Sequence, residues 1–223
     1  MSSVTLHRPW LTLDLGGEMQ VLSWAMNKPG FVTARRILWR EVRNRDLPEH
    51  MDVSAWLDGE LAAANAQDAV CFLTSRDIGH VTQHTVHVGA VSAHCVATVG
   101  LGNAERVGQR VARHADEWGT INIAVALTCA MSKTGLIEAS SIATQARTVA
   151  IIDAGLTIAT GRATGTGTDC IAIAAPKGDN TYAGLHTDVG EAIGAAVYRA
   201  TLTGAQGWIA ENAKAAEQGN TPC

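Results

Sequence analysis

The order of the apolar runs along the sequence is the feature that most constrains the fold of this chain. Short runs rich in β-branched residues predict strands at 70–74, 81–88, 91–99, 121–128 and 170–175. Apolar residues at helical spacing predict helices at 51–65, 135–153 and 187–213. Because extended runs crowd the first half and long helices the second, we expect an α+β fold. Its central sheet should be mostly antiparallel or mixed and covered by long helices, with an αββα layering as one form of this arrangement.

The N-terminal segment adds further strands. Leu11, Leu13 and Leu15 alternate with polar residues, and the pair 16–17 (Gly-Gly) then interrupts the pattern, which predicts a β-hairpin. A second turn is predicted at 27–30 and a further strand at 31–42. In the last helix, Asp188 followed by Glu191 predicts the N-terminal cap.

Length and charge restrict the class of protein. The 223 residues predict a single domain, 1–223, with a frayed tail at 214–223. Only 17% of residues are charged, so much of the chain is interior or covered by a subunit interface, and a homo-oligomer is compatible with this composition. A net charge of −4 gives no general attraction to nucleic acid or to an anionic membrane surface. The five cysteines are scattered without a C-x-x-C pair, and with no secretory or membrane-spanning pattern we expect a cytoplasmic protein.

The run from Ala163 to Asp169 is the strongest functional signal. It places Thr164, Gly165, Thr166, Gly167 and Thr168 directly before an apolar strand. Glycine allows a backbone to approach a ligand closely, and threonine and aspartate supply donors and acceptors at that range. The segment therefore predicts the wall of a polar ligand site, with a plain tight turn as the alternative. A nucleotide site is disfavoured because phosphate-binding glycines follow a strand and open a helix, whereas these precede a strand.

Other polar residues provide candidates of lower specificity. Thr120 and Asn122 open a strand, Glu138 lies early in the 135–153 helix, and His186 and Thr187 precede the last helix. Each has an ordinary structural explanation, namely a strand edge, a helix dipole and a helix cap respectively. Four histidines lie between His80 and His94, but strand geometry points neighbouring side chains to opposite faces, so we expect no protein-bound metal.

Several segments, in order, resemble the adenosylcobinamide amidohydrolase family, also called CbiZ. The similar segments are Leu22–Asn27 with Gly30–Phe31, Phe72–Ser75, Ala97–Ala104, Gly119–Ile123, Glu138–Arg147, Ala163–Asp169 and Tyr182–Gly190. Pro29, Ser75 and Arg147 depart from the residues that are usual in the family.

The resemblance implies hydrolysis of the amide that joins the aminopropanol arm of adenosylcobinamide to the corrin ring, which gives adenosylcobyric acid in corrinoid salvage. Amide hydrolysis requires an activated water or nucleophile, oxyanion donors and a proton donor for the amine. Asp169, His186 and Glu138 are the predicted proton-transfer groups. Thr120, Asn122, Thr187 and the 164–168 loop are predicted to bind the corrin's peripheral amides. Cobalt would arrive within the substrate, so no separate cofactor is expected.

Three alternatives remain open on the sequence. The chain fits a non-catalytic corrinoid or tetrapyrrole carrier, an amidase of the same fold that acts on another amide, or a structural subunit of an oligomer. Release of aminopropanol from adenosylcobinamide separates the first of these from an enzyme.

Overall fold

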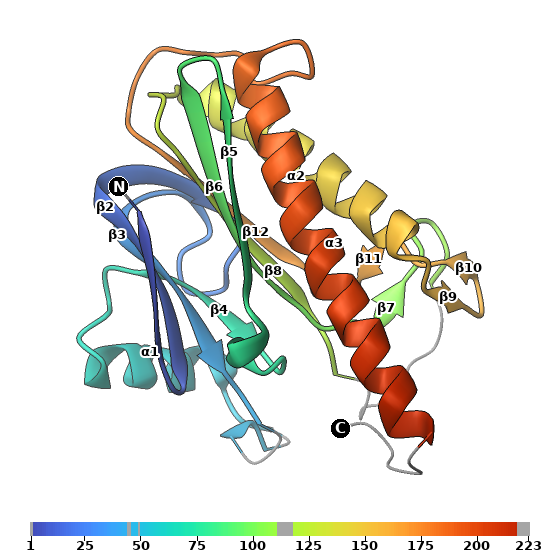
Figure 1. Cartoon of the computed structure of the whole chain (residues 1–223). Coiled ribbons are helices and arrows are strands. Elements are labelled where there is room, and N and C mark those ends of the chain that lie inside the picture. Colours follow the sequence, from blue (N-terminus) through green and yellow to red (C-terminus); the bar gives the residue numbers. More distant parts are fainter. Residues whose placement is uncertain (1, 44–45, 49, 111–117, 218–223) are drawn as a thin grey trace.

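The computed structural model describes residues 2–43, 46–48, 50–110 and 118–217. Within these ranges the helices are α1 (Val53–Ala63), α2 (Lys133–Ala154) and α3 (Asp188–Glu217) (Figure 1). The longer strands are β1 (Ser3–His7), β2 (Trp10–Ser23), β3 (Gly30–Glu41), β4 (Val70–Thr74), β5 (Thr82–Val88), β6 (Val91–Val99), β8 (Ile121–Leu127) and β12 (Cys170–Ala175). Two-residue strands are β7 (Ala104–Glu105), β9 (Thr157–Ile158), β10 (Gly161–Arg162) and β11 (Gly165–Thr166).

The eight longer strands form one sheet in the described part of the chain. Its order is β4-β3-β2-β12-β8-β6-β5, and β1 pairs with β2 beside this path. The β3–β4 and β12–β8 pairs are parallel and the others are antiparallel. The predicted α+β fold with a mixed sheet is therefore confirmed.

The sheet bends along β2, whose pairing with β3 is irregular between Asp14 and Met19. Before the irregularity β2 pairs with β1, and after it β2 pairs with β12. The predicted hairpin at 16–17 is wrong, because both flanking runs continue as one strand against β3. Gly16 accommodates the irregularity with a φ of 74°, and its amide donates to the Asp14 carboxylate at 2.7 Å.

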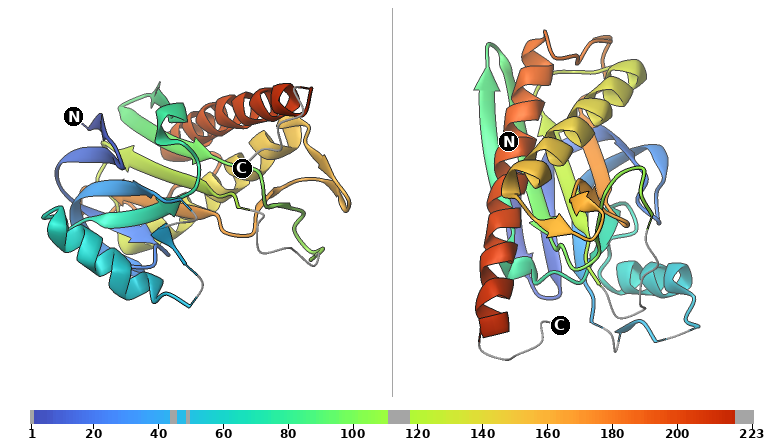
Figure 2. Two further views of the ribbon diagram at one scale, coloured as in Figure 1. Left: turned by 90° about the horizontal axis from the view of Figure 1, so that it is seen from below. Right: turned by 90° about the vertical axis from the view of Figure 1, so that its right-hand side faces the viewer.

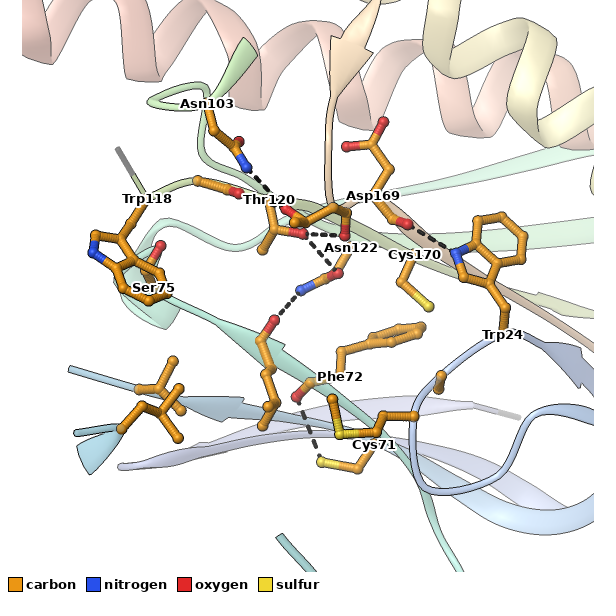
Figure 3. Close-up of a pocket in the computed structure, with 17 residues that line it drawn as sticks. Trp24, Cys71, Phe72, Ser75, Asn103, Trp118, Thr120, Asn122, Asp169 and Cys170 are labelled. Atoms are coloured by element: carbon orange, nitrogen blue, oxygen red, sulfur yellow. Dashed lines mark hydrogen bonds between the residues drawn. The ribbon is translucent and has the colours of Figure 1, made fainter. Parts of the chain in front are cut away.

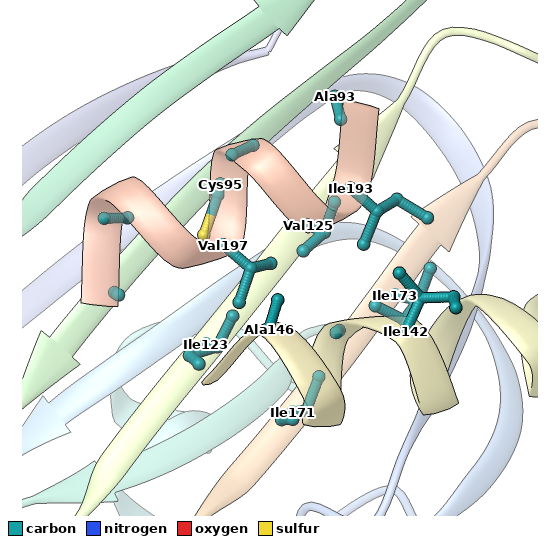
Figure 4. Close-up of a cluster of buried hydrophobic side chains, with 14 of the residues drawn as sticks. Ala93, Cys95, Ile123, Val125, Ile142, Ala146, Ile171, Ile173, Ile193 and Val197 are labelled. Carbon is teal, nitrogen blue, oxygen red and sulfur yellow. The ribbon is translucent and has the colours of Figure 1, made fainter. Parts of the chain in front are cut away.

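Three buried apolar clusters show that this bent sheet makes two layers between helices. One cluster joins α2 and α3 to the outer face of β5, β6, β8 and β12 (Figures 2 and 4). A second lies between the two halves of the sheet, and a third joins α1 to β3 and β4. The expected αββα layering is present, with both β layers supplied by one continuous sheet.

Strand β12 is apolar along nearly its whole length because both of its faces are buried. Ile171 and Ile173 pack against the helices, whereas Ala172 and Ala174 face the other half of the sheet. A strand buried on both faces cannot alternate apolar with polar residues.

The helix ends differ slightly from prediction. The N-terminal cap of α3 is Thr187, one residue before the predicted Asp188, because the Thr187 hydroxyl accepts from the Gly190 amide at 3.0 Å. Helix α3 also continues through Glu217, so the predicted frayed tail is helical over 214–217, and residues 218–223 lie outside the described ranges. No helix in the described ranges has the length and apolar character to span a membrane.

Candidate functional site

A cavity of about 470 Å³ opens between the two sheet layers where β4 ends and β8 begins (Figure 3). Thr120, Asn122, Thr168 and Asp169, all predicted site residues, line it. They come together because β8 and β12 are parallel neighbours, with Cys170 opposite Asn122. The segments preceding these two strands therefore meet at the same edge of the sheet.

Neutral polar groups form a connected network along this wall. The Asn103 amide donates to the Thr168 hydroxyl at 3.1 Å, and that hydroxyl donates to the Gly119 carbonyl at 2.7 Å. The Thr120 hydroxyl lies 2.9 Å from the Thr168 carbonyl and 3.2 Å from Asn122 Oδ1, so its single proton serves one acceptor at a time. Asn103 Oδ1 is buried and has no partner among the described residues, which leaves an acceptor in the cavity wall.

Asn122 connects the two sheet layers. Its Nδ2 atom donates to the Leu73 carbonyl at 2.7 Å, across from β8 to β4. Asn122 is 1% exposed, so this hydrogen bond is shielded from solvent. The bond fixes the spacing of the cavity walls at the point where the apolar packing between the layers ends.

The rest of the wall is apolar and aromatic. Trp24 and Trp118 are 51% and 47% exposed, which is unusual for side chains of this size. Trp24 is held in place because its indole N–H donates to the Asp169 carbonyl at 2.8 Å (Figure 3). The cavity thus offers exposed aromatic faces next to neutral amides and hydroxyls.

The hydroxyls of the 164–168 loop are used within the protein. The Thr164 hydroxyl accepts from the Val107 amide at 2.8 Å, the Thr166 hydroxyl donates to the Asp169 carboxylate, and Thr168 belongs to the network above. The loop also forms β11, which pairs with β7. These side chains therefore shape the wall, and the positions of the loop that remain for a ligand are spare acceptor positions and backbone atoms.

A second hollow of about 400 Å³ lies on the other side of the same loop. It is lined by residues 164–167 together with Arg106 and Arg147, and it shares Trp24 and Asp169 with the first cavity. The predicted loop is therefore not sealed in a dry interior. It separates two adjoining cavities.

The Asp169 carboxylate is the ionised centre of this region. It pairs with Arg147, accepts from the Thr166 hydroxyl, and accepts from the backbone amides of Thr166 and Ile121 at 3.2 and 3.3 Å. Burial raises the pKa of Asp169, while the Arg147 charge and the Thr166 donors act in the opposite direction. The Nε atom of Arg147 is buried without a partner in the described structure.

The structure does not bring Glu138, His186 and Thr187 to Asp169. Glu138 accepts from the Ala183 amide at 2.6 Å, and the Thr187 hydroxyl donates to the Gly184 carbonyl at 2.8 Å. Thr187 and Ala183, the partner of Glu138, belong to the loop that follows β12, whereas Asp169 precedes that strand. Along α2, Glu138 and Arg147 are separated by roughly 14 Å at about 1.5 Å per residue. His186 is exposed in the same distant loop.

Two thiols also line the first cavity. Burial raises the pKa of Cys71 to about 12 and that of Cys170 to about 11, so both are protonated at neutral pH. No group of three or more His, Cys, Asp or Glu side chains within the described ranges is placed to hold a metal ion.

Sequence reasoning did not assign roles to Trp24, Asn103, Trp118 or Arg147. A signal was present for two of them, since Trp24 directly follows a strand and Asn103 lies in a glycine-rich turn after another. Arg147 gave no such signal, because only the packing of α2 against the loop pairs it with Asp169.

Comparison with known proteins identifies the same family that the sequence segments resemble. A search of curated proteins found no match to the chain. The family model of adenosylcobinamide amidohydrolase, CbiZ, matches residues 2–213, which is nearly the whole chain and includes every residue of both cavity walls. The chain therefore belongs to the adenosylcobinamide amidohydrolase family.

Proposed function

We propose that this protein hydrolyses the amide between the corrin ring and the aminopropanol arm of adenosylcobinamide, which yields adenosylcobyric acid and the free amino-alcohol. We place the reaction at the two cavities that adjoin Asp169. Cobalt enters as part of the substrate. The observation that supports this proposal most is the combination of exposed Trp24 and Trp118 with the neutral network of Asn103, Thr120 and Asn122 in one cavity.

This combination suits a corrinoid because the macrocycle presents a broad apolar face and many peripheral carboxamides. Aromatic side chains bind apolar faces with a large contact area, and neutral amides and hydroxyls pair with carboxamides without burying a charge. A cavity of about 470 Å³ holds only part of so large a ligand. The exposed tryptophans and the neighbouring hollow extend the contact surface.

Asp169 is the proton acceptor in the proposed chemistry. A water molecule attacks the amide carbon while its proton passes to the Asp169 carboxylate. The C–N bond then breaks, and the proton moves to the departing amine. A carboxylate whose pKa is raised by burial is a stronger base than one in water, which favours this role.

Arg147, which lines the second cavity beside Asp169, is the proposed donor to the developing oxyanion. Residues 164–168 hold Asp169 between the cavities and contact the substrate through backbone atoms. Glu138 and Thr187 receive no role in bond cleavage, because they support the loop that follows β12, and His186 receives none because it is exposed in that loop.

The test is incubation of the purified protein with adenosylcobinamide, with aminopropanol and adenosylcobyric acid separated by chromatography. Asp169→Asn should lower turnover at least about a hundredfold, as loss of a general base typically does. Asp179→Asn, which alters an exposed carboxylate after β12, is the matched control and should leave turnover unchanged.

Three outcomes would contradict the proposal. Corrinoid binding without product indicates a carrier, and hydrolysis restricted to simple amides in a substrate panel indicates a different amidase. Native turnover by Asp169→Asn would remove the proposed base.

A further inference from the structure

A separate cavity of about 840 Å³ lies between the sheet layers at the opposite end of β8 from Asn122. Thr128, which follows β8, lines this cavity, and Asn122 lines the first one. At about 3.3 Å per residue, these two residues are roughly 20 Å apart along the strand. The second cavity is therefore a distinct place in the fold.

The inner face of β5 and β6 is polar at this cavity. The strand register places Gln83 opposite Val96 and Thr85 opposite His94, so all four side chains share one face. Val96 continues this face into the apolar cluster between the layers, whereas Gln83, Thr85 and His94 line the cavity. Gln83 and Thr85 are exposed and His94 is half-buried, so this part of the face is open to water or a ligand and is not packed as core.

Three of the lining side chains are hydrogen-bonded in series. Ser2 Oγ lies 2.8 Å from His94 Nδ1, and His94 Nε2 lies 3.2 Å from Gln83 Oε1. Because Gln83 presents its carbonyl oxygen, the imidazole proton resides on Nε2, and Nδ1 accepts the Ser2 hydroxyl proton. This sequence of hydroxyl, imidazole and orienting oxygen has the distances that an activated nucleophile requires.

The protonation state of His94 agrees with this geometry. Burial lowers the pKa of His94, so the ring is neutral at pH 7 and its Nδ1 lone pair is available. Glu18 and His87 are the other titratable side chains that line the cavity. Neither forms an ion pair with His94 within the described structure.

We propose that Ser2 is a nucleophile that His94 activates, and that this cavity takes up small carboxylic esters. Ser2 Oγ forms a bond to the ester carbonyl carbon while the hydroxyl proton moves to His94 Nδ1. The ester C–O bond then breaks, and that proton leaves with the alcohol. Water hydrolyses the resulting acyl-serine, which releases the carboxylic acid and restores the hydroxyl.

Two probes test this site on the whole protein: a fluorophosphonate, which labels activated serines covalently, and 4-nitrophenyl acetate, whose hydrolysis is followed by absorbance. Peptide mass spectrometry should locate the label on Ser2. The matched serine control is Ser3→Ala, because Ser3 is the neighbouring exposed hydroxyl and does not line the cavity. Ser3→Ala should label at the native rate, and Ser2→Ala should not label.

His94→Ala should slow both reactions at least about a hundredfold, the usual contribution of a general base. Its control is His84→Ala, since His84 lies on the other face of β5, opposite Cys95 of the helix-side cluster. Gln83→Ala should slow labelling and ester hydrolysis less than His94→Ala does. Gln83→Glu, which keeps an acceptor oxygen, should react at the wild-type rate. Circular dichroism and thermal unfolding of each variant establish that it is folded.

Absence of a label on Ser2 in folded wild-type protein overturns the proposal, as does labelling that is equally fast in His94→Ala. Corrinoid hydrolysis is measured in parallel. Because the two sites share no lining residue, Ser2→Ala should leave that reaction at its native rate.

Discussion

Arg147 of α2 forms an ion pair with Asp169, and the two side chains are only 14% and 8% exposed. The guanidinium reaches Asp169 by passing over Gly165, and it also contacts the Thr164 carbonyl at 3.4 Å. One side chain of a helix thus holds both the carboxylate and the backbone of the loop between the two cavities.

Loss of this pair should destabilise the fold. Arg147→Met leaves the Asp169 carboxylate buried without its counterion, and removal of one partner of a buried pair typically costs about 3–5 kcal/mol. Urea unfolding followed by circular dichroism measures the change. Arg147→Lys keeps the charge and should recover part of the loss. An unfolding free energy that is unchanged in Arg147→Met would show that the pair contributes no net stability.

Gly165 should not tolerate a side chain. A Cβ atom at this position would overlap Nη1 of Arg147 and lie 2.6 Å from the Asp169 carboxylate. Gly165→Ala should therefore displace the ion pair, lower stability by about 1–3 kcal/mol and reduce corrinoid turnover. Gly167→Ala is the matched control, because its nearest neighbour would be a Glu105 carbon at 4.0 Å. Equal thermal stability and turnover for the two variants would argue against the close approach.

Asn122→Leu should lower the unfolding free energy by about 1–3 kcal/mol, because it leaves the Leu73 carbonyl buried without a donor. Thr98→Val provides the contrast. Thr98 pairs with Asn122 in the β6–β8 register, but its hydroxyl is buried without a partner in the described structure. Its removal should be neutral or stabilising in the same denaturation assay. A larger loss for Thr98→Val than for Asn122→Leu would contradict this assignment.

Trp24→Ala should weaken adenosylcobinamide binding by at least about tenfold, which corresponds to about 1.4 kcal/mol. The variant removes an exposed aromatic face from both cavities. Trp24→Phe keeps a smaller aromatic ring and loses the hydrogen bond to the Asp169 carbonyl, so its affinity should be intermediate. Trp208→Phe lies on α3 away from either cavity and serves as the control. Fluorescence titration measures the dissociation constants, and native affinity in Trp24→Ala would exclude stacking on this side chain.

The stability of the protein should respond to the titration of Asp169. Its pKa is raised above the ordinary value of 3.8, so the folded state binds this proton more tightly than the unfolded state. This contribution is present at low pH, and it decreases as the pH rises through the folded pKa. The unfolding free energy of the wild type relative to Asp169→Asn should therefore fall as the pH is raised from about 4 to neutrality. A difference that grows with pH would mean that the Arg147 charge outweighs burial.

Local sequence patterns predicted most of the secondary structure. The period of the apolar residues identified α1, α2, α3 and the strands β3, β4, β5, β6, β8 and β12, because each element must bury one or both faces. The Gly16–Gly17 error has a tertiary cause. Glycine pairs permit a reversal of the chain, but pairing with β3 on both sides kept β2 continuous. The one-residue shift of the α3 cap arose because Thr187 and Asp188 are both good capping residues.

The candidate site was predicted in part. The residues around 120–122 and 164–169 lie together as a site wall, since two parallel strands place their preceding loops at one edge of the sheet. Glu138 and His186 were grouped with Asp169 because each is able to transfer a proton. The chemical type of a residue does not indicate how far it lies from another residue. The structure places Glu138 and His186 near the end of β12 that is opposite to Asp169.

The sequence by itself determined which segments are buried and how often their side chains face the core, because periodicity is a local property of the chain. It also determined the family, through segments that occur in a fixed order. Only the tertiary structure decided that one sheet bends to supply both inner layers, that Arg147 meets Asp169, and that Ser2, His94 and Gln83 lie in series. These relationships join residues far apart in the chain, and their geometry depends on the strand order and the bend of β2, which no local pattern specifies.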